Sequence, residues 1–213
     1  LYDSKSPSAS VVKLDLEFVA HHWKDTSFDI WEEISGQHFY TRIVHRRALV
    51  EGAKLADRLG DTGAASFYRQ QIKPLEAAIE SHWDARRGLI LPTLDRDQGI
   101  DYKTSDMDMA VLLGVMHAQG GDGYYSLSDS RVLASMEKYI RRLNVIYPIN
   151  AKGYGAVAIG RYPEDVYDGY TTGGTGNPWF LATPAIAEIH YTVAKQIAAS
   201  SDPFARDDLN GEF

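Results

Sequence analysis

The residues most suited to catalysis lie in one hexapeptide, Phe-Asp-Ile-Trp-Glu-Glu at positions 28–33, which contains three carboxylates and one indole. Cleavage of a glycosidic bond needs one protonated carboxylic acid that donates to the leaving oxygen, and a second, ionised carboxylate that activates water or attacks the sugar. An apolar wall and a neighbouring like charge both favour a protonated carboxyl group, so Trp31 beside Glu32 and Glu33 could provide such an acid. Asp and Glu are also common in the first turn of a helix, and on the hexapeptide alone this structural interpretation is favoured.

Three further segments strengthen the catalytic interpretation. They are His45-Arg-Arg-Ala-Leu-Val-Glu51, Gly160-Arg-Tyr-Pro-Glu-Asp-Val-Tyr167 and Gly176-Asn-Pro-Trp-Phe-Leu-Ala-Thr183. Together with the acidic hexapeptide, and in this order, they resemble the glucoamylases of glycoside hydrolase family 15. The resemblance extends from about Leu14 to about Ile197.

This resemblance implies an all-α fold, the (α/α)6 toroid, in which six helical hairpins surround a central axis and the active site lies in a funnel at one end. Twelve helices with their loops need about 400 residues, so this chain covers roughly half of the toroid. We therefore expect residues 1–213 to be a partial catalytic domain whose amino- and carboxy-terminal parts are missing. An upstream Trp-Thr-Arg-Asp segment and a downstream general-base glutamate, both typical of the family, are absent, and no matching context surrounds Asp202, Asp207, Asp208 and Glu212.

Within the hexapeptide, the resemblance assigns the general acid to Glu32, which would protonate the glycosidic oxygen. Asp29 is implied as its catalytic partner, which accepts a proton or holds the neighbouring geometry. Ile30 and Glu33 are implied in sugar binding. Trp31 would pack on the sugar ring or shield Glu32 from water, and core packing is an equally open alternative for this indole.

The later segments supply the remaining substrate-binding candidates. The planar five-donor fork of Arg161 matches the paired hydroxyls of a terminal sugar. An internal ion pair from Arg161 to Glu164 or Asp165 is the alternative, and the two roles are compatible. Trp179 offers a flat apolar face for a glucose ring and Tyr167 a ring with a hydroxyl, with packing inside the loop as the alternative for both.

The activity that the resemblance implies is that of an exo-acting glucan 1,4-α-glucosidase, which releases glucose from the non-reducing ends of starch-type glucans with inversion. Its partners would be starch, maltodextrins and maltose, it would need neither cofactor nor metal, and the full-length protein would be a secreted monomer. Two alternatives stay open: another α-glucan or trehalose hydrolase on the same toroid, and a non-catalytic glucan-binding or regulatory subunit. The intact acids speak against the second alternative, because a binding module has no need of a proton donor.

Composition narrows the function further. The net charge of −7 and the pI near 5.5 argue against nucleic acid or an anionic membrane as a partner, because both attract basic surfaces. Short basic clusters, such as residues 45–47 and 141–142, are interpreted as solvated helix faces. No apolar stretch approaches the roughly 20 residues that cross a bilayer. Cysteine is absent, so the redox compartment cannot be inferred, and the pair His21-His22 lacks partners at metal-ligand spacing.

The elements that must position the candidate residues are helices, because apolar residues recur at spacings of three and four. We expect a first helix over residues 11–23 capped by Ser8 or Ser10, a loop over residues 25–37, a long helix that ends before Gly60, a helix capped by Asp61 or Thr62, and helices from about Ser105, Ser130 and Asn177. The last helix would have Pro178 in its first turn and a buried side made of Ile186, Ile189, His190, Val193 and Ile197.

The loops carry the function in this scheme. If the hexapeptide enters a helix near Ile30, Asp29 and Glu32 share one helix face, while Glu33 points roughly 100° away. Residues 88–92 are expected to form a short extended segment. Two long glycine-rich loops cover residues 118–129 and 150–176, and the second contains an insertion-like stretch at 168–175 that leaves the chain-length preference open.

Overall fold

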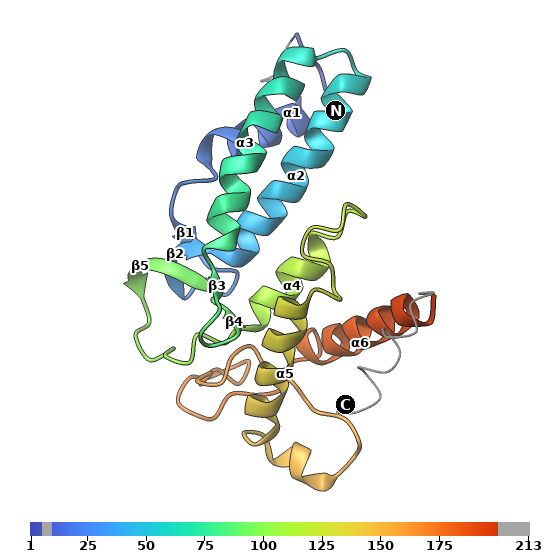
Figure 1. Cartoon of the computed structure of the whole chain (residues 1–213). Coiled ribbons are helices and arrows are strands. Elements are labelled where there is room, and N and C mark those ends of the chain that lie inside the picture. Colours follow the sequence, from blue (N-terminus) through green and yellow to red (C-terminus); the bar gives the residue numbers. More distant parts are fainter. Residues whose placement is uncertain (6–9, 200–213) are drawn as a thin grey trace.

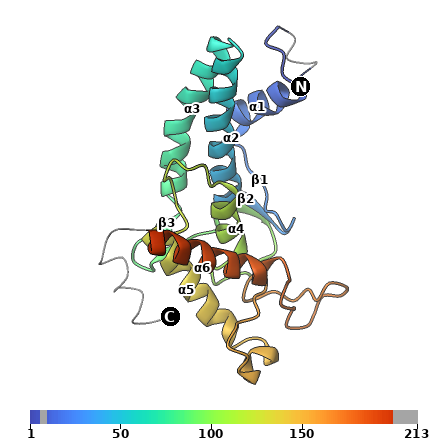
Figure 2. The ribbon, with the colours of Figure 1, turned by 90° about the vertical axis from the view of Figure 1, so that its right-hand side faces the viewer.

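The computed structural model describes residues 1–5 and 10–199. Helices α1, α2 and α3 gather in one half of the molecule, α5 and α6 lie in the other, and α4 lies between them (Figures 1 and 2). Ser8, the alternative cap of the first helix, and the acids at 202, 207, 208 and 212 lie outside the described residues. The elements are α1 (Val11–His22), β1 (Ser27–Phe28), β2 (Ile34–His38), α2 (Phe39–Arg58), α3 (Thr62–Glu80), β3 (Trp83–Asp84), β4 (Leu89–Ile90), β5 (Thr93–Gly99), α4 (Met109–His117), α5 (Ser130–Asn144), the 3-10 helix η2 (Pro148–Lys152) and α6 (Ala182–Ala199).

The first helices follow the sequence signals closely. The Ser10 side chain accepts a hydrogen bond from the N–H of Lys13 and caps α1, as one of the two expected serines. Helix α2 stops before Gly60, which has a φ of 77°, and Asp61 caps α3 by accepting from the N–H of Ala64. The resulting hairpin buries one apolar stripe from each helix, and α1 packs across it with Leu16 against Gly52.

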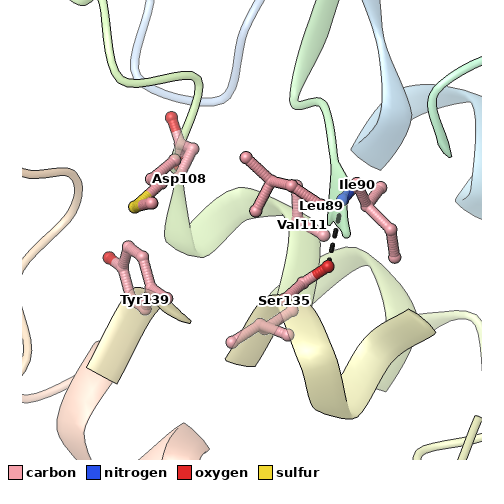
Figure 3. Close-up of a pocket in the computed structure, with 8 residues that line it drawn as sticks. Leu89, Ile90, Asp108, Val111, Ser135 and Tyr139 are labelled. Carbon is pink, nitrogen blue, oxygen red and sulfur yellow. Dashed lines mark hydrogen bonds between the residues drawn. The ribbon is translucent and has the colours of Figure 1, made fainter. Parts of the chain in front are cut away.

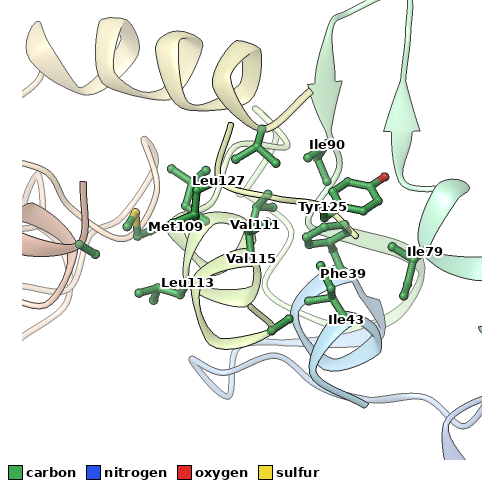
Figure 4. Close-up of a cluster of buried hydrophobic side chains, with 14 of the residues drawn as sticks. Phe39, Ile43, Ile79, Ile90, Met109, Val111, Leu113, Val115, Tyr125 and Leu127 are labelled. Atoms are coloured by element: carbon green, nitrogen blue, oxygen red, sulfur yellow. The ribbon is translucent and has the colours of Figure 1, made fainter. Parts of the chain in front are cut away.

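Helix α4 is the centre of the core. Its residues from Met109 to Val115 are all buried, and side chains from α2, α3 and the strands surround them (Figure 4). Gly114 lets α2 approach closely, since a Cβ at this position would lie 3.0 Å from the Cα of Tyr40. The helix begins at Met109 and not near Ser105, because the carboxylate of Asp108 caps it by accepting from the N–H of Ala110 at 2.7 Å.

Helix α5 begins at Ser130, as expected, and joins the β3–β4 hairpin. The hydroxyl of Ser135 accepts a hydrogen bond from the N–H of Ile90 at 3.0 Å (Figure 3). Strand β4 falls within residues 88–92, so the short extended segment is confirmed. A small pocket lies between α4 and α5 and is lined by Leu89, Ile90, Met107, Asp108, Val111, Leu112, Ser135 and Tyr139.

A small antiparallel sheet replaces part of the loop expected over residues 25–37. Its strand order is β1-β2-β5, and a bulge interrupts the pairing of β2 with β5 between Ser35 and Gln37. Gly99 ends β5 against the hexapeptide, where a Cβ would lie 2.1 Å from the carbonyl oxygen of Glu33. The expectation of a loop was wrong because the pairing of β2 is with residues about 60 positions away, which periodicity does not detect.

Helix α6 starts at Ala182, five residues after the expected start at Asn177. The N–H of Trp179 donates to the carbonyl of Ile159 at 2.8 Å, so the preceding chain is held outside the helix. Pro184, not Pro178, lies in the first turn, where its missing N–H costs nothing. Of the expected buried side, Ile186, Ile189 and Val193 are buried and Ile197 is partly buried. His190 is exposed and does not belong to it.

The expectation that the basic clusters are solvated helix faces was only partly correct. Arg141 is exposed, but Arg46 is buried, with ion pairs to Glu76 at 2.7 Å and to Asp122 at 2.8 Å. The basic cluster at 45–47 is therefore not a solvated helix face. Helix α1 leaves three large apolar side chains exposed on one stripe: Val11, Leu14 and Phe18. Among the described residues, no helix combines the length and the hydropathy needed to cross a bilayer.

The buried His82 connects the start of α2 with the chain that follows β4. Its Nδ1 lies 2.7 Å from the carbonyl oxygen of Leu91, and its Nε2 lies 3.0 Å from the guanidinium of Arg42. Because a guanidinium can only donate, the second nitrogen of His82 must accept, so the ring is neutral. Burial lowers the pKa of His82 to about 4.

This shift predicts an acid-sensitive stability. Between pH 6.5 and 4, the unfolded state binds more protons at His82 than the folded state, so the free energy of unfolding falls as the pH falls. We expect a contribution of about 2 to 3 kcal/mol to be lost by pH 4. His82→Gln should be less stable at pH 7 but lose correspondingly less on acidification. Urea unfolding of the protein that carries this chain, at pH 7, 5.5 and 4, measures both effects, and an equal pH slope in variant and wild type would contradict the assignment.

Candidate active site

The hexapeptide forms a tight turn between β1 and β2, not the start of a helix. The N–H of Glu32 donates to the carbonyl of Asp29 at 3.0 Å, which closes the turn. The Asp29 carboxylate accepts from the N–H of Trp31 at 3.2 Å and from the N–H of Glu33 at 2.8 Å. We name residues 29–33 the acid turn. The helical geometry was a wrong prediction, because the Asp29 side chain competes for the N–H groups that a helix would use.

The three acids of the turn have different surroundings. Asp29 is only 8% exposed and is committed to the backbone, and Glu33 is partly buried. Glu32 is exposed and makes no ion pair or side-chain hydrogen bond among the described residues. Its φ of 61° lies in the left-handed region, which is costly for a residue with a Cβ. Asp29 and Glu32 therefore do not share a helix face, and the strained residue is the one whose carboxylate projects into solvent.

Arg161 joins the acid turn to the loop that follows η2. It is 5% exposed, and its Nη1 lies 2.9 Å from Oε1 of Glu33. The other side of the guanidinium donates to both oxygens of Asp165, at 2.8 and 2.6 Å. Of the two alternative partners, Asp165 is the one used. Glu164 instead accepts from the backbone N–H and the hydroxyl of Ser105.

Aromatic rings surround the same guanidinium. Its central carbon lies 5.4 Å from the ring centre of Trp31, 5.5 Å from that of Tyr167 and 5.4 Å from that of Trp179. The rings of Tyr167 and Trp179 also contact each other, with centroids 6.1 Å apart. The structure thus brings together five of the predicted substrate-binding residues. Ile30, the sixth, lies at the exposed tip of the acid turn.

Some buried polar atoms in this cluster lack partners. Neither Oε2 of Glu33 nor the indole nitrogen of Trp179 has a hydrogen-bond partner of standard geometry among the described residues. Burial raises the pKa of the Glu33 carboxyl, and the neighbouring Tyr162 hydroxyl, followed by the charge of Arg161, opposes this effect. Unsatisfied buried polar atoms are rare in folded proteins, so each of them needs a physical explanation.

A second cationic centre lies beneath the acid turn. Lys103 is fully buried and forms ion pairs with Asp29, at 3.5 Å, and with Asp108. Asp108 in turn accepts from the indole N–H of Trp31 at 3.0 Å. Neither Lys103 nor Asp108 was predicted from the sequence as a site residue. The only signal for Asp108 is its position directly before the apolar run of α4, which is typical of a helix cap.

The described residues contain no group of three or more His, Cys, Asp or Glu side chains placed to hold a metal ion. The arrangement instead combines an exposed acid, a buried guanidinium with two carboxylates, and a set of aromatic rings. Such a combination can hold a neutral polyhydroxylated ring and deliver a proton to it.

Comparison with known proteins decides the family. Residues 3–205 match the family model of the glycosyl hydrolases family 15. The chain belongs to glycoside hydrolase family 15.

Relatives in family 15 support this assignment. A glucoamylase of Blastobotrys adeninivorans is 39% identical over 199 residues, which cover 90% of this chain and 31% of the relative. An intracellular sporulation-specific glucoamylase of Saccharomyces cerevisiae is 30% identical over 204 residues, covering 90% of this chain and 36% of the relative. The chain thus spans about a third of the length of these curated relatives.

A solved family 15 structure confirms the fold class. The glucoamylase from Saccharomycopsis fibuligera matches with a TM-score of 0.79 and 30% identity, over 91% of this chain and 40% of that structure. The described helices are therefore part of an (α/α)6 toroid. The chain corresponds to somewhat less of this structure than the expected half.

The geometry of the acid turn predicts a specific loss of stability in Asp29→Asn. The amide oxygen can replace one carboxylate oxygen as the acceptor for backbone N–H groups, but the amide nitrogen then faces the ammonium of Lys103, and two donors oppose each other. We expect the free energy of unfolding to fall by roughly 1 to 3 kcal/mol. Asp25→Asn is the matched control, because Asp25 is exposed and its ion pair with His22 should contribute less than about 1 kcal/mol. Urea unfolding distinguishes the two, and equal effects would mean that Asp29 does not hold the turn.

Proposed function

We propose that residues 1–213 are a partial glucoamylase catalytic domain, which supplies the general acid and part of the sugar site of an exo-acting glucan 1,4-α-glucosidase. The enzyme releases glucose from the non-reducing ends of starch-type glucans with inversion. The observation that carries this proposal is the position of Glu32, an exposed carboxylate held at a left-handed backbone angle next to the aromatic cluster around Arg161. Backbone strain of this kind gathers at functional sites.

The different surroundings of the three acids in the turn support Glu32 as the proton donor. Asp29 is occupied by backbone N–H groups and Lys103, and Glu33 by Arg161. Glu32 is the acid of the turn whose carboxyl group is open to a substrate. Asp29 then contributes by holding the geometry of the turn, which is one of the two roles that the sequence suggested for it.

The sugar contacts follow from the same cluster. Trp31, Tyr167 and Trp179 offer apolar ring faces, and aromatic faces pack well on the C–H face of glucose. Glu33, which is only partly buried, offers a carboxylate acceptor for hydroxyl groups. Ile30 at the tip of the turn adds an apolar contact. Maltose, maltodextrins and starch are the substrates that this set of groups fits.

Inversion requires a second carboxylate about 6.5 to 9.5 Å from Glu32, with room for a water between them. We assign this general base to a part of the longer protein outside residues 1–213, since the relatives are about three times as long as this chain. The exposed stripe of Val11, Leu14 and Phe18 on α1 would pack against that part. Secretion and a monomeric state stay predictions, and one of the relatives is named as an intracellular enzyme.

The anomeric form of the product tests the reaction. The longer protein that contains this chain should release glucose from maltose, and the first product seen by proton NMR should be β-glucose, because water attacks from the face opposite the α-linkage. α-Glucose as the first product would exclude inversion. Shortened dextrins without free glucose would exclude exo-action.

Replacement of the proton donor gives the sharpest test of the site. Glu32→Gln keeps the size of the side chain but removes the transferable proton, so kcat on maltose should fall by roughly 10² to 10⁴ while KM changes little. α-Glucosyl fluoride has a leaving group that needs little protonation, so its hydrolysis should be largely retained. Steady-state kinetics on both substrates measure this contrast. Near-normal hydrolysis of maltose by Glu32→Gln would show that Glu32 is not the acid.

Arg161→Lys is the matched comparison, because it keeps the charge and loses the fork. It should lower kcat/KM on maltose and on the fluoride alike, since sugar binding is common to both substrates. A thermal unfolding curve for each variant separates this effect from loss of the fold.

A further inference from the structure

We propose that Lys103 is the positioning residue of the acid turn: its ammonium holds Asp29 and Asp108 together and thereby fixes the direction in which Glu32 presents its proton. This inference rests on the proposed function, since it concerns how the same acid is aimed. It assigns a role to a residue that carries no sugar-binding or proton-transfer chemistry of its own.

The surroundings of Lys103 are complete without any ligand. The side chain is 0% exposed, and its Nζ contacts one carboxylate oxygen of Asp29 and one of Asp108. The ring centre of Tyr162, which is also fully buried, lies 4.1 Å from Nζ. Two anions and a ring face compensate the charge, so burial of this ammonium is tolerated. Because it is inaccessible, Lys103 acts through its partners and not on the substrate.

Each carboxylate that is paired with Lys103 accepts hydrogen bonds from residues next to Glu32 in the chain. Oδ1 of Asp29 accepts the N–H groups of Trp31 and Glu33, the two neighbours of Glu32 in the chain, and Oδ2 faces the ammonium. Asp108 accepts the indole N–H of Trp31. The backbone of the acid turn and the indole next to the acid are therefore both tied to one cation.

The same contacts connect the acid turn to the rigid core. Asp108 caps α4 through the N–H of Ala110, and α4 is the most deeply buried helix. The loop that carries Lys103 is joined to the turn at the backbone, because the N–H of Ile100 donates to the carbonyl of Glu33 at 3.0 Å. Lys103 thus fixes the acid turn, which has no regular secondary structure, relative to α4.

Removal of the ammonium would leave two carboxylates buried in one cluster. Like charges at such a distance cannot both stay ionised in a buried site, so one group would take up a proton or move away. Either change weakens the acceptors that hold the turn. A misplacement of about 1 Å at a catalytic group is enough to slow turnover by about 10²-fold.

The test uses three variants of the longer enzyme. Lys103→Met removes the charge at similar length. Lys103→Met with Asp108→Asn restores the charge balance, since the amide oxygen of Asn can still accept from Trp31 and Asn is a good helix cap. Lys54→Met is the control, because Lys54 is exposed on α2 and pairs only with Glu51 among the described acids.

We expect Lys103→Met to lower kcat on maltose about 10- to 100-fold, with KM within about threefold of wild type and hydrolysis of α-glucosyl fluoride largely retained. The double variant should unfold near the wild-type temperature and keep the reduced ratio of the maltose rate to the fluoride rate, because Asp29 still lacks its cation. Lys54→Met should have the wild-type ratio.

Maltose and fluoride rates that fall by the same factor in the Lys103 variants would indicate a merely structural role and overturn the proposal. A wild-type ratio in the folded double variant would also overturn it. A wild-type enzyme that releases no glucose from maltose would overturn the proposed function and this inference with it. An active wild type with an unaffected Lys103→Met would overturn the inference alone.

Discussion

The architecture of the site depends on the burial of one guanidinium. Arg161 is almost inaccessible to solvent, and a buried charge is tolerated only when partners compensate it closely. Asp165 comes from the same loop, but Glu33 comes from the distant acid turn, so the ion pair between Glu33 and Arg161 fixes two segments relative to each other. The aromatic rings of Trp31, Tyr167 and Trp179 contact the same guanidinium, and packing against it holds these rings in place.

A second buried cation, beneath the acid turn, is compensated in the same way. Lys103 has two carboxylate partners, as Arg161 has, so two cations face four carboxylates: Asp29, Asp108, Glu33 and Asp165. When ionised, this set has an excess of negative charge close to the place where the sugar ring would lie. Glycosidic cleavage develops positive charge on that ring, and a fixed negative field stabilises such a transition state.

Local signals in the sequence predicted the helices well. Ser10, Asp61 and the stop at Gly60 behave as caps and breakers should, because the physics of a helix end involves only neighbouring residues. The motifs also pointed to Glu33, Arg161 and the aromatic residues that the fold brings together, while the catalytic role of Glu32 stays a prediction. Two errors arose where distant contacts decide the conformation: β2 pairs with the distant β5, and α6 starts late because Trp179 donates to Ile159. The helical geometry of the acid turn failed for a local reason, because the Asp29 side chain accepts the N–H groups of its neighbours.

Lys103 illustrates the limit of such prediction. It lies 74 residues from Asp29 in the sequence, in a polar loop without a motif, and its importance follows only from its complete burial. A lysine in a polar loop is ordinarily a solvated surface residue. Its role becomes apparent only when the loop folds under the acid turn.

The order of the segments along the chain has a consequence for biosynthesis. Helices α2 and α3 are adjacent in the sequence and pack against each other, so this hairpin can form while the ribosome is still adding later residues. The acid turn cannot be completed at that stage, because its cation arrives with residue 103 and its guanidinium with residue 161. Until the chain has been made as far as Arg161, the carboxylates of the site lack their partners, and the nascent protein exposes acids that the finished site encloses. Ordering of the site is therefore a late event in the synthesis of this chain.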